Sequence, residues 1–205
     1  MQKRKVFIVA GNQQYSDLFL GFGMTITEHL NEAHLVVFTG GEDVTPGMYG
    51  AKAHPSTYNS IRRDEYESAI FEHCKLAGIP MVGICRGGQF LNVMNGGAMY
   101  QNVSRHTNDH VIIDSTTNER VFATSTHHQM MKPSSKGILV AFSGLGGNRQ
   151  WYEGQDYYED MSDLDIEVVF YPETCCLCFQ PHPEFGEQPL KDYFLSLLTR
   201  YNLLT

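Results

Sequence analysis

The chain has 205 residues, 42% of them hydrophobic, and a formal net charge of -8 at pH 7. This length and composition suit one α/β domain with a sizeable core. The acidic balance excludes a global electrostatic field for holding nucleic acid or anionic lipid. No apolar run approaches the roughly 18 residues of a membrane span.

The five cysteines, an odd number that includes the adjacent pair Cys175 and Cys176, suit reduced thiols better than a disulfide framework. Residues 1–11 carry a basic cluster and a short apolar stretch, which we interpret as a strand and not as a signal peptide. We therefore expect a cytoplasmic protein that binds neither nucleic acid nor a membrane.

The first half of the chain alternates buried apolar runs with segments of helical periodicity. The expected strands are residues 5–10, 33–39 and 80–84, and the expected helices are residues 15–32, 60–77 and 87–95. Alternation of this kind is typical of parallel βαβ units.

The second half consists of short apolar runs separated by turn residues. We expect strands at residues 111–114, 120–124, 138–143, 166–171 and 175–179, and a final helix at 190–204. Most of these strands would add to the sheet in antiparallel fashion, and one would return to its centre. The predicted fold is a three-layer α/β, flavodoxin-like domain over residues 1–205, with a mostly parallel central sheet and antiparallel additions.

Residues 144–165 are rich in glycine, acidic residues and tyrosine, and contain the single tryptophan, Trp151. We interpret them as a long loop, a flap or an insertion, because long loops in compact domains are usually functional or disordered. Their aromatic side chains could cover a site, contact a partner or pack on the domain.

Residues 81–89, MVGICRGGQ, contain the most informative motif. A buried strand runs into Gly-x-Cys-x-Gly and directly into a helix, the nucleophile-elbow pattern with sulfur in place of oxygen. The turn would place Cys85 at a helix N-terminus, where the dipole favours the thiolate, and would leave the Arg86 N–H free for an oxyanion. Taken alone, the motif fits a buried structural cysteine equally well.

A base for that nucleophile is found in residues 180–184, QPHPE, at the end of an apolar strand. Residues two apart in an extended segment project to the same side. Glu184 can therefore orient the His182 ring while the other ring nitrogen faces Cys85. Without the elbow, the two prolines would favour a surface turn.

These two motifs resemble the class I glutamine amidotransferases and, within them, the branch of the γ-glutamyl-GABA hydrolases. Weaker similarities to the same branch are residues 39–44 with Pro46, Tyr49 and Gly50, Arg63-Asp64 with Glu67, residues 96–101, residues 125–129 and Ile166-Glu167. The resemblance spans residues 39–184. Thr124 and Ser60 depart from residues common in the family, which leaves the sub-branch open but does not affect the triad.

The resemblance implies a role for each matching residue. Cys85, His182 and Glu184 would form the catalytic triad. The oxyanion hole would consist of the N–H groups of Gly41 and Arg86. The substrate-binding residues would be Gly40, Gln89, His127 and His128.

We expect no cofactor and no metal. His106, His110, His127 and His128 are close in sequence, but their spacing matches no familiar zinc pattern. We expect the last two to shape the pocket instead. The cysteines of residues 175–178 lie in an apolar run, where cysteine behaves as a small hydrophobic residue.

The resemblance implies a glutaminase that hydrolyses the side-chain amide of glutamine through a Cys85 γ-glutamyl thioester. The ammonia would pass to a separately encoded synthase or ligase. One alternative is a stand-alone hydrolase of γ-glutamyl amines, with the same chemistry and a larger leaving group. Another is a non-catalytic binding module of the same fold, against which the intact triad residues argue.

Overall fold

The computed structural model describes residues 3–204. The first two residues of the basic amino-terminal stretch and the last residue of the chain lie outside this range. None of the helices within it is long and apolar enough to cross a membrane.

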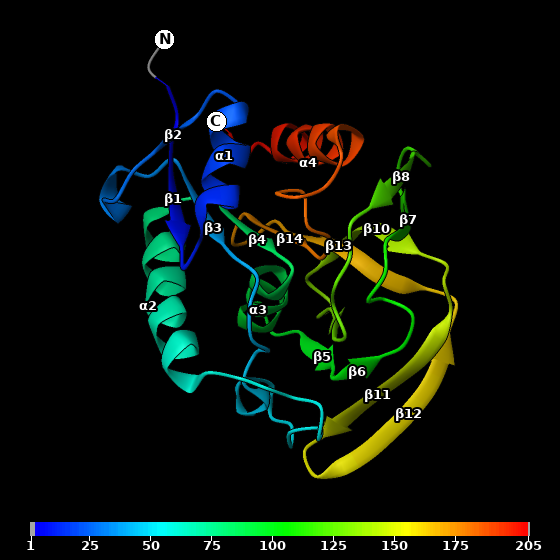
Figure 1. Cartoon of the computed structure of the whole chain (residues 1–205). Helices are drawn as coiled ribbons and strands as arrows, with labels where there is room; N and C mark the ends of the chain where they lie inside the picture. Colours follow the sequence, from blue (N-terminus) through cyan, green and yellow to red (C-terminus); the bar gives the residue numbers. More distant parts are fainter. Residues whose placement is uncertain (1–2, 205) are drawn as a thin grey trace.

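A mixed sheet, built from nine of the strands within residues 3–204, organises the fold (Figure 1). The strands are β1 (Lys5–Val9), β2 (Thr25–Ile26), β3 (Leu35–Phe38), β4 (Met81–Ile84), β7 (His110–Asp114), β8 (Arg120–Ala123), β10 (Ile138–Ser143), β13 (Asp165–Tyr171) and β14 (Cys176–Phe179). Their order is β2-β1-β3-β4-β14-β13-β10-β7-β8. Neighbours are parallel from β2 to β14 and antiparallel from β14 to β8, which confirms the predicted mixture.

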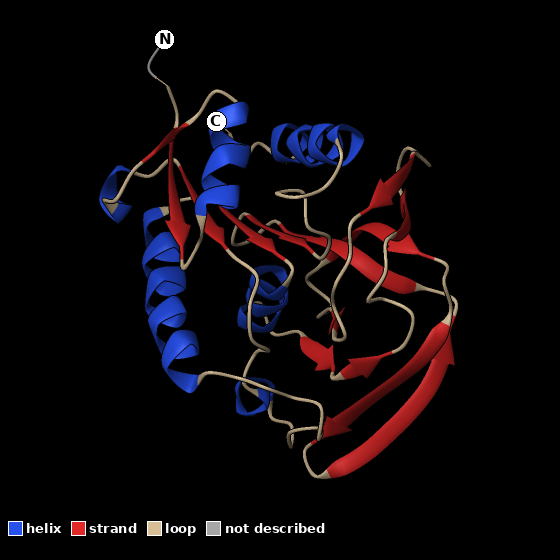
Figure 2. Ribbon diagram, viewed as in Figure 1, coloured by secondary structure: helices blue, strands red, loops and turns tan. Residues whose placement is uncertain are grey.

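Helices cover both faces of the parallel half of the sheet and complete three layers (Figure 2). They are α1 (Gln13–Gly21), α2 (Ile61–Ala77), α3 (Arg86–Met94) and α4 (Gln188–Arg200), with short 3-10 turns at Leu30–Glu32 and Pro46–Tyr49. Alternate residues of each strand feed two separate cores, as the twofold periodicity of a strand requires. One core lies under α1 and α4, and the other lies under α2 and α3.

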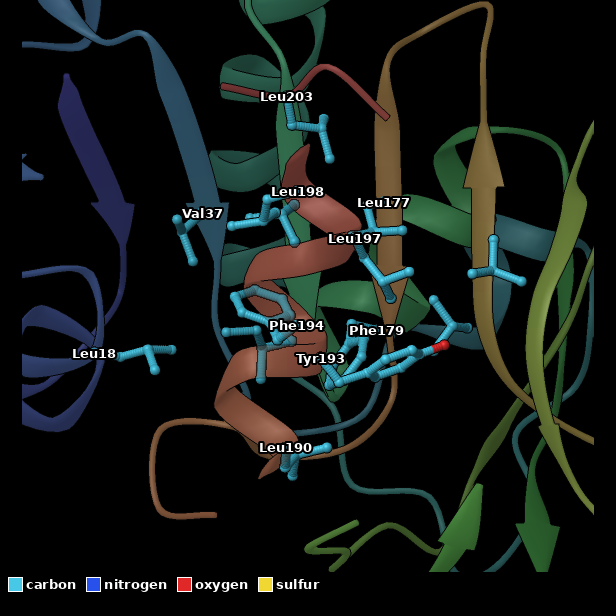
Figure 3. Packing of buried hydrophobic residues seen from close by; sticks show 14 of the residues in the cluster. Leu18, Val37, Leu177, Phe179, Leu190, Tyr193, Phe194, Leu197, Leu198 and Leu203 are labelled. Atoms are coloured by element: carbon cyan, nitrogen blue, oxygen red, sulfur yellow. The ribbon is translucent and has the colours of Figure 1, made fainter. Parts of the chain in front are cut away.

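Helix α4 shows how a core forms (Figure 3). On its buried face, Phe194 and Leu197 pack against Leu177 and Phe179 of β14. The rings of Phe194 and Phe179 meet edge to face, with their centroids 4.9 Å apart. Cys176 and Cys178 alternate with these residues along β14, point into the opposite core and are fully buried, as expected for apolar strand residues. The strand is therefore buried on both faces, which explains its unbroken apolar sequence.

Residues 144–165 do not form the long loop that was one interpretation of their sequence. The segment forms a hairpin of β11 (Gly147–Glu153) and β12 (Asp156–Ser162), and β11 also pairs with β6 (Asn102–Val103). Trp151 stacks on Tyr158 across the hairpin, and Arg149 forms a bidentate ion pair with Asp160 at 2.8 Å. Such cross-strand pairs stabilise a sheet without the alternation of apolar and polar residues that reveals a half-buried strand in sequence.

The expected helix at residues 15–32 is also too long. Helix α1 ends at Gly21, and Gly23 then adopts a positive φ of 77° that reverses the chain. The following residues form β2 on the edge of the sheet beside β1. Two further short strands, β5 (Ala98–Tyr100) and β9 (Met130–Lys132), pair outside the main sheet and were not predicted.

Candidate active site

The site lies where three neighbouring parallel strands end. Strand β4 pairs with β3 on one side and with β14 on the other, so the loops that follow these strands meet at one sheet edge. The loop after β3 carries Gly40 and Gly41, β4 is followed by Cys85, and β14 leads to His182. The Cys85 N–H donates to the Phe179 carbonyl oxygen at 2.8 Å, which ties the elbow directly to the end of β14.

Cys85 has the strained backbone of a nucleophile elbow. Its φ of 52° and ψ of -113° place it outside the helical region, at the N-cap of α3. A Cβ on Gly83 would lie 2.2 Å from the Gly87 carbonyl oxygen, and a Cβ on Gly87 would lie 2.1 Å from the Phe38 carbonyl oxygen. Both glycines are therefore required for the tight strand-to-helix turn that the sequence motif predicts.

His182 and Glu184 are arranged as their spacing predicts. The Nδ1 atom of His182 lies 2.7 Å from Oε1 of the buried Glu184. The Nε2 atom faces the opposite way, toward Cys85, and lies 3.0 Å from the hydroxyl of Thr126. Burial opposes protonation of His182, but its contacts with Cys85 and Glu184 outweigh burial and raise the pKa of His182 to about 10. The imidazole is therefore protonated at neutral pH, with its Nε2 proton on the side of the ring that faces Cys85.

Gly40 and Gly41, in the loop after β3, lie beside Cys85 and His182. Gly41 has a φ of +146°, which favours glycine, and it lines the pocket beside Arg86. The N–H of Gly40 is already used, since it donates to the Tyr15 hydroxyl at 3.0 Å. Gly40 packs behind Cys85 and His182 and is not part of the pocket lining, so the structure does not place it where the resemblance implies a substrate contact.

A buried network of charged residues connects helix α2 to the loop after β3 and to the start of α3. Arg63 of α2 donates to the carbonyl oxygens of Thr39 and Gly40 at 3.0 Å and pairs with Glu67 at 2.9 Å. The guanidinium of Arg86, fully buried, pairs with Asp64 and Glu67. Helix α2 thus holds the loop after β3 and the first residue of α3 in one arrangement.

The pocket itself has a volume of about 460 Å³. Its lining residues are Gly41, Glu42, Asp43, Tyr58, Cys85, Arg86, Gln89, Thr126, His127, His128, Gln129 and His182. On one side His128 pairs with Asp43 at 3.1 Å, and this carboxylate raises the pKa of His128. The pocket therefore presents a thiol, an imidazole and several polar groups to one small space.

Two predicted substrate contacts have other partners within the protein. The Gln89 amide donates to the Gln129 carbonyl oxygen at 3.1 Å and lies 3.3 Å from the Gln180 side-chain oxygen. The His127 ring belongs to a buried cluster with His106, His110 and Glu167, and its Nδ1 lies 2.9 Å from the Gln129 carbonyl oxygen, although the residue also borders the pocket.

Several pocket residues were not identified from the sequence. Tyr58 lies in a loop with no distinguishing pattern of its own. Asp43, Thr126, Arg63 and Glu67 were noted only within weak similarities, with no role assigned to them. A signal for the buried network was the pattern of residues on α2, where Asp64 and Glu67 share the face that also carries Ile70 and Phe71.

The fold and the elbow together define a class I glutamine amidotransferase-like α/β protein. The chain belongs to the Peptidase C26 family, whose model matches residues 20–146. The match includes Cys85 and ends before His182.

Relatives and solved structures agree with this assignment. A glutamine amidotransferase-like protein of Lactococcus lactis is 29% identical over 84% of this chain and 79% of its own length. A Mycobacterium tuberculosis protein provisionally named glutamine amidotransferase is 29% identical, and the match covers 76% of this chain but only 52% of that protein. This chain therefore spans about half the length of the second relative.

Two structures show the shared fold at low sequence identity. A protein of Thermoplasma acidophilum that is provisionally named a GMP synthase subunit superposes with a TM-score of 0.67 at 12% identity, covering 98% of this chain and 96% of that one. PurLQS of Thermotoga maritima gives 0.62 at 18% identity, covering 98% and 99%. Both likenesses support the three-layer fold predicted from sequence.

Proposed function

We propose that this chain is a cysteine-dependent hydrolase of γ-glutamyl amides, with glutamine as its first substrate. The observation that carries the proposal is the strained Cys85 at the N-terminus of α3, with the His182–Glu184 pair beside it at the edge of a pocket. A strained elbow, an oriented imidazole and an adjacent pocket are what covalent acyl transfer requires.

In the first half of the reaction, Nε2 of His182 holds the proton of the Cys85 thiol, and the Cys85 sulfur attacks the side-chain amide carbon of glutamine. The negative charge that develops on the amide oxygen is received by the N–H groups of Gly41 and Arg86. The first N–H groups of a helix have no acceptor within the helix, which leaves that of Arg86 available. Preorganised donors of this kind are worth roughly 10²–10³ in rate each.

Breakdown of the tetrahedral intermediate completes the transfer. Protonated His182 donates its Nε2 proton to the leaving nitrogen, the C–N bond breaks, and ammonia departs from a γ-glutamyl thioester on Cys85. Neutral His182 then takes a proton from water, whose oxygen attacks the thioester carbon. Glutamate leaves and the thiol is restored. Glu184 keeps the imidazole in one tautomer and stabilises its charge throughout.

The proposal also concerns the protein that receives the ammonia. We propose transfer to a separately encoded synthase or ligase, because free ammonia would be a wasted product. The names of the two solved structures refer to PurLQS and to part of a synthase, which supports a similar role for this chain by analogy of fold. Docking of that partner could raise the activity of the isolated chain.

A second candidate is hydrolysis of γ-glutamyl amines by the chain alone. The pocket volume of about 460 Å³ favours it, because it lies within the range of roughly 300–1,000 Å³ found for pockets that hold drug-sized ligands.

Release of ammonia and glutamate from glutamine, measured beside release of amine from a panel of γ-glutamyl amines, tests both candidates. Cys85→Ala should abolish turnover, whereas Cys175→Ala, which removes a partly exposed thiol far along the chain, should leave it unchanged. Preference for an amine over glutamine would select the second candidate. If Cys85→Ala retained wild-type turnover, the proposed chemistry would be wrong. If no substrate were turned over, co-purification would have to reveal an activating partner, or the chain is a binding module.

A further inference from the structure

A second cluster of reactive side chains lies behind the pocket and takes no part in the chemistry proposed above. His106, His110, His127 and Glu167 are all buried, and each offers one ligand atom such that these atoms lie within 4.8 Å of one another. His110 belongs to β7 and Glu167 to β13, while His106 and His127 lie in the loops before β7 and after β8. The fold thus gathers three imidazoles around one carboxylate.

Backbone carbonyl groups set the tautomers of two of these imidazoles. Nδ1 of His110 lies 2.9 Å from the carbonyl oxygen of Asn108, and Nδ1 of His127 lies 2.9 Å from that of Gln129. A carbonyl can only accept, so each Nδ1 carries the proton. Nε2 is therefore the atom through which each neutral ring would bind a metal. It faces Glu167 at 2.8 Å in His110, where it forms a hydrogen bond in the absence of an ion, and at 3.6 Å in His127.

His106 is oriented in a related way by a second carboxylate. Its Nε2 lies 3.2 Å from Oδ2 of the buried Asp165, and its Nδ1 lies 3.2 Å from Oε1 of Glu167. Asp165 thus lies beside Nε2, and Nδ1 is the atom that faces the cluster. Histidine ligands of metals usually donate their second N–H to a carboxylate or a backbone carbonyl. His110 and His127 have such a carbonyl partner, and Asp165 lies at ion-pair distance from His106.

The cluster has more acceptors than donors. Among the described residues, both ring nitrogens of His106, Nε2 of His127, Oε2 of Glu167 and Oδ2 of Asp165 are buried without a hydrogen-bond partner. Buried polar atoms normally have partners, because an unsatisfied one costs about 1–3 kcal/mol. A single divalent cation bound by neutral rings would satisfy these unpartnered atoms and would balance the charges of Glu167 and Asp165.

We propose that His106, His110, His127 and Glu167 form a four-coordinate site for a divalent metal ion, with Zn²⁺ the best match. Imidazole nitrogen and carboxylate oxygen are established zinc ligands, and four protein ligands with no open position are typical of a structural site. Bonds of about 2.0–2.1 Å place tetrahedral ligand atoms about 3.4 Å apart, so ligand atoms that are now up to 4.8 Å apart must approach by as much as about 1.4 Å. A surface hollow of about 460 Å³ borders His110 and provides a route of entry.

The expectation of no metal was based on the spacing of histidines along the chain, which does not reveal this cluster. The proposed ligands come from four segments, and Glu167 is separated from His127, the nearest histidine of the cluster, by 40 positions. Only the antiparallel strands that join the second half of the sheet bring these segments together.

A metal at this place would hold the segment that forms one wall of the pocket. The residue before His127 is Thr126, which bonds the His182 ring, and the residue after it is His128. Ser125 is tied to the same loops, since its hydroxyl donates to the His106 carbonyl oxygen. The ion would therefore be a structural support for the pocket and would not contact the substrate.

The test is metal content and metal affinity of the purified chain. We expect elemental mass spectrometry to find about one zinc ion per chain, either as purified or after titration with ZnCl₂. When CoCl₂ is added in place of ZnCl₂, we expect the visible absorption of four-coordinate Co²⁺. Because the ligands are nitrogen and oxygen, the Co²⁺ spectrum should lack a thiolate charge-transfer band. This readout needs no enzymatic activity, so it stands apart from the proposed function.

Variants locate the ion. Glu167→Gln should lower the affinity for Zn²⁺ by at least about 100-fold, and Asp165→Asn, which only orients His106, by about 10–100-fold. His73→Ala, at an exposed position of α2, is the matched control and should bind as the wild type does. Near-ultraviolet circular dichroism shows whether each variant is folded, and if Glu167→Gln is not, Asp165→Asn decides. A wild-type chain that takes up neither ion, or binding that Asp165→Asn leaves unchanged, would overturn the proposal in favour of a cluster held by protons alone.

Discussion

Replacement of Arg63 by methionine separates a positioning role from a merely structural one. Arg63 holds the carbonyl oxygens of Thr39 and Gly40 at 3.0 Å, and the next residue, Gly41, supplies one of the two proposed oxyanion donors. Without Arg63 the loop loses two charge-assisted hydrogen bonds, each worth about 1.5–3 kcal/mol. Loss of one well-placed oxyanion donor costs roughly 10²–10³ in rate. We therefore expect kcat on the best substrate to fall by about 10²–10³-fold in Arg63→Met.

The assay pairs turnover with alkylation of Cys85 by iodoacetamide. Alkylation forms no oxyanion, so its rate should stay within about twofold of wild type while kcat falls. Arg62→Met, at the exposed neighbouring position of α2, is the control and should change neither rate. If folded Arg63→Met turned over at the wild-type rate, or lost alkylation and turnover equally, the positioning argument would be refuted.

Four further predictions concern protonation and packing. Because Glu184 helps to raise the pKa of His182 to about 10, Glu184→Gln should move the alkaline limb of the kcat/KM profile to lower pH. The same shift means that the His182 contribution to stability is fully present below pH of about 6.5 and is lost as pH rises through about 10, which urea unfolding at graded pH would measure. Gly83→Ala would place a methyl carbon 2.2 Å from a backbone oxygen, so it should lower the free energy of unfolding by about 3 kcal/mol or prevent folding. A methyl group at Gly21 would meet nothing within 4 Å, so Gly21→Ala should be tolerated, and urea midpoints of the two variants would show the difference. Asp114 is buried, and hydrogen bonds from two backbone N–H groups, a tyrosine and an arginine lower its pKa to about 2 despite burial. Asp114→Asn should therefore destabilise the fold by about 2 kcal/mol at pH 7, and the wild type should lose this contribution as pH falls from about 3.9 through about 2, which unfolding of the two chains at graded pH would follow.

The parallel half of the fold and the motif residues were accessible from sequence because their signals are local. A buried strand that runs into a glycine-flanked cysteine needs only nine consecutive residues to be recognised. The two-residue spacing of His182 and Glu184 likewise fixes their shared orientation within one extended segment. These interactions depend on geometry that the backbone imposes over a few positions.

The rest depends on contacts between distant segments, which leave little trace in local patterns. The hairpin of β11 and β12 is held by pairs such as Trp151 with Tyr158, and its acidic sequence resembles that of a loop. The position of Arg63 beneath the loop after β3 follows from the packing of α2 and cannot be read from its charge. Buried histidines look like surface histidines until the sheet is assembled, which is why the cluster around Glu167 was not predicted.

The place of β14 in the sheet has a consequence for how the protein is made. This strand is among the last elements of the chain, yet it lies between β4 and β13 in the middle of the sheet. While the ribosome is still adding residues, β4 therefore has an open edge of apolar sequence that has no neighbour on that side. Such an edge invites aggregation of the nascent chain, and the long loops that β14 must close make folding slow. The same order withholds His182 from Cys85 until β14 and the loop after it have been synthesised, so the nucleophile gains its base only once the whole sheet has closed.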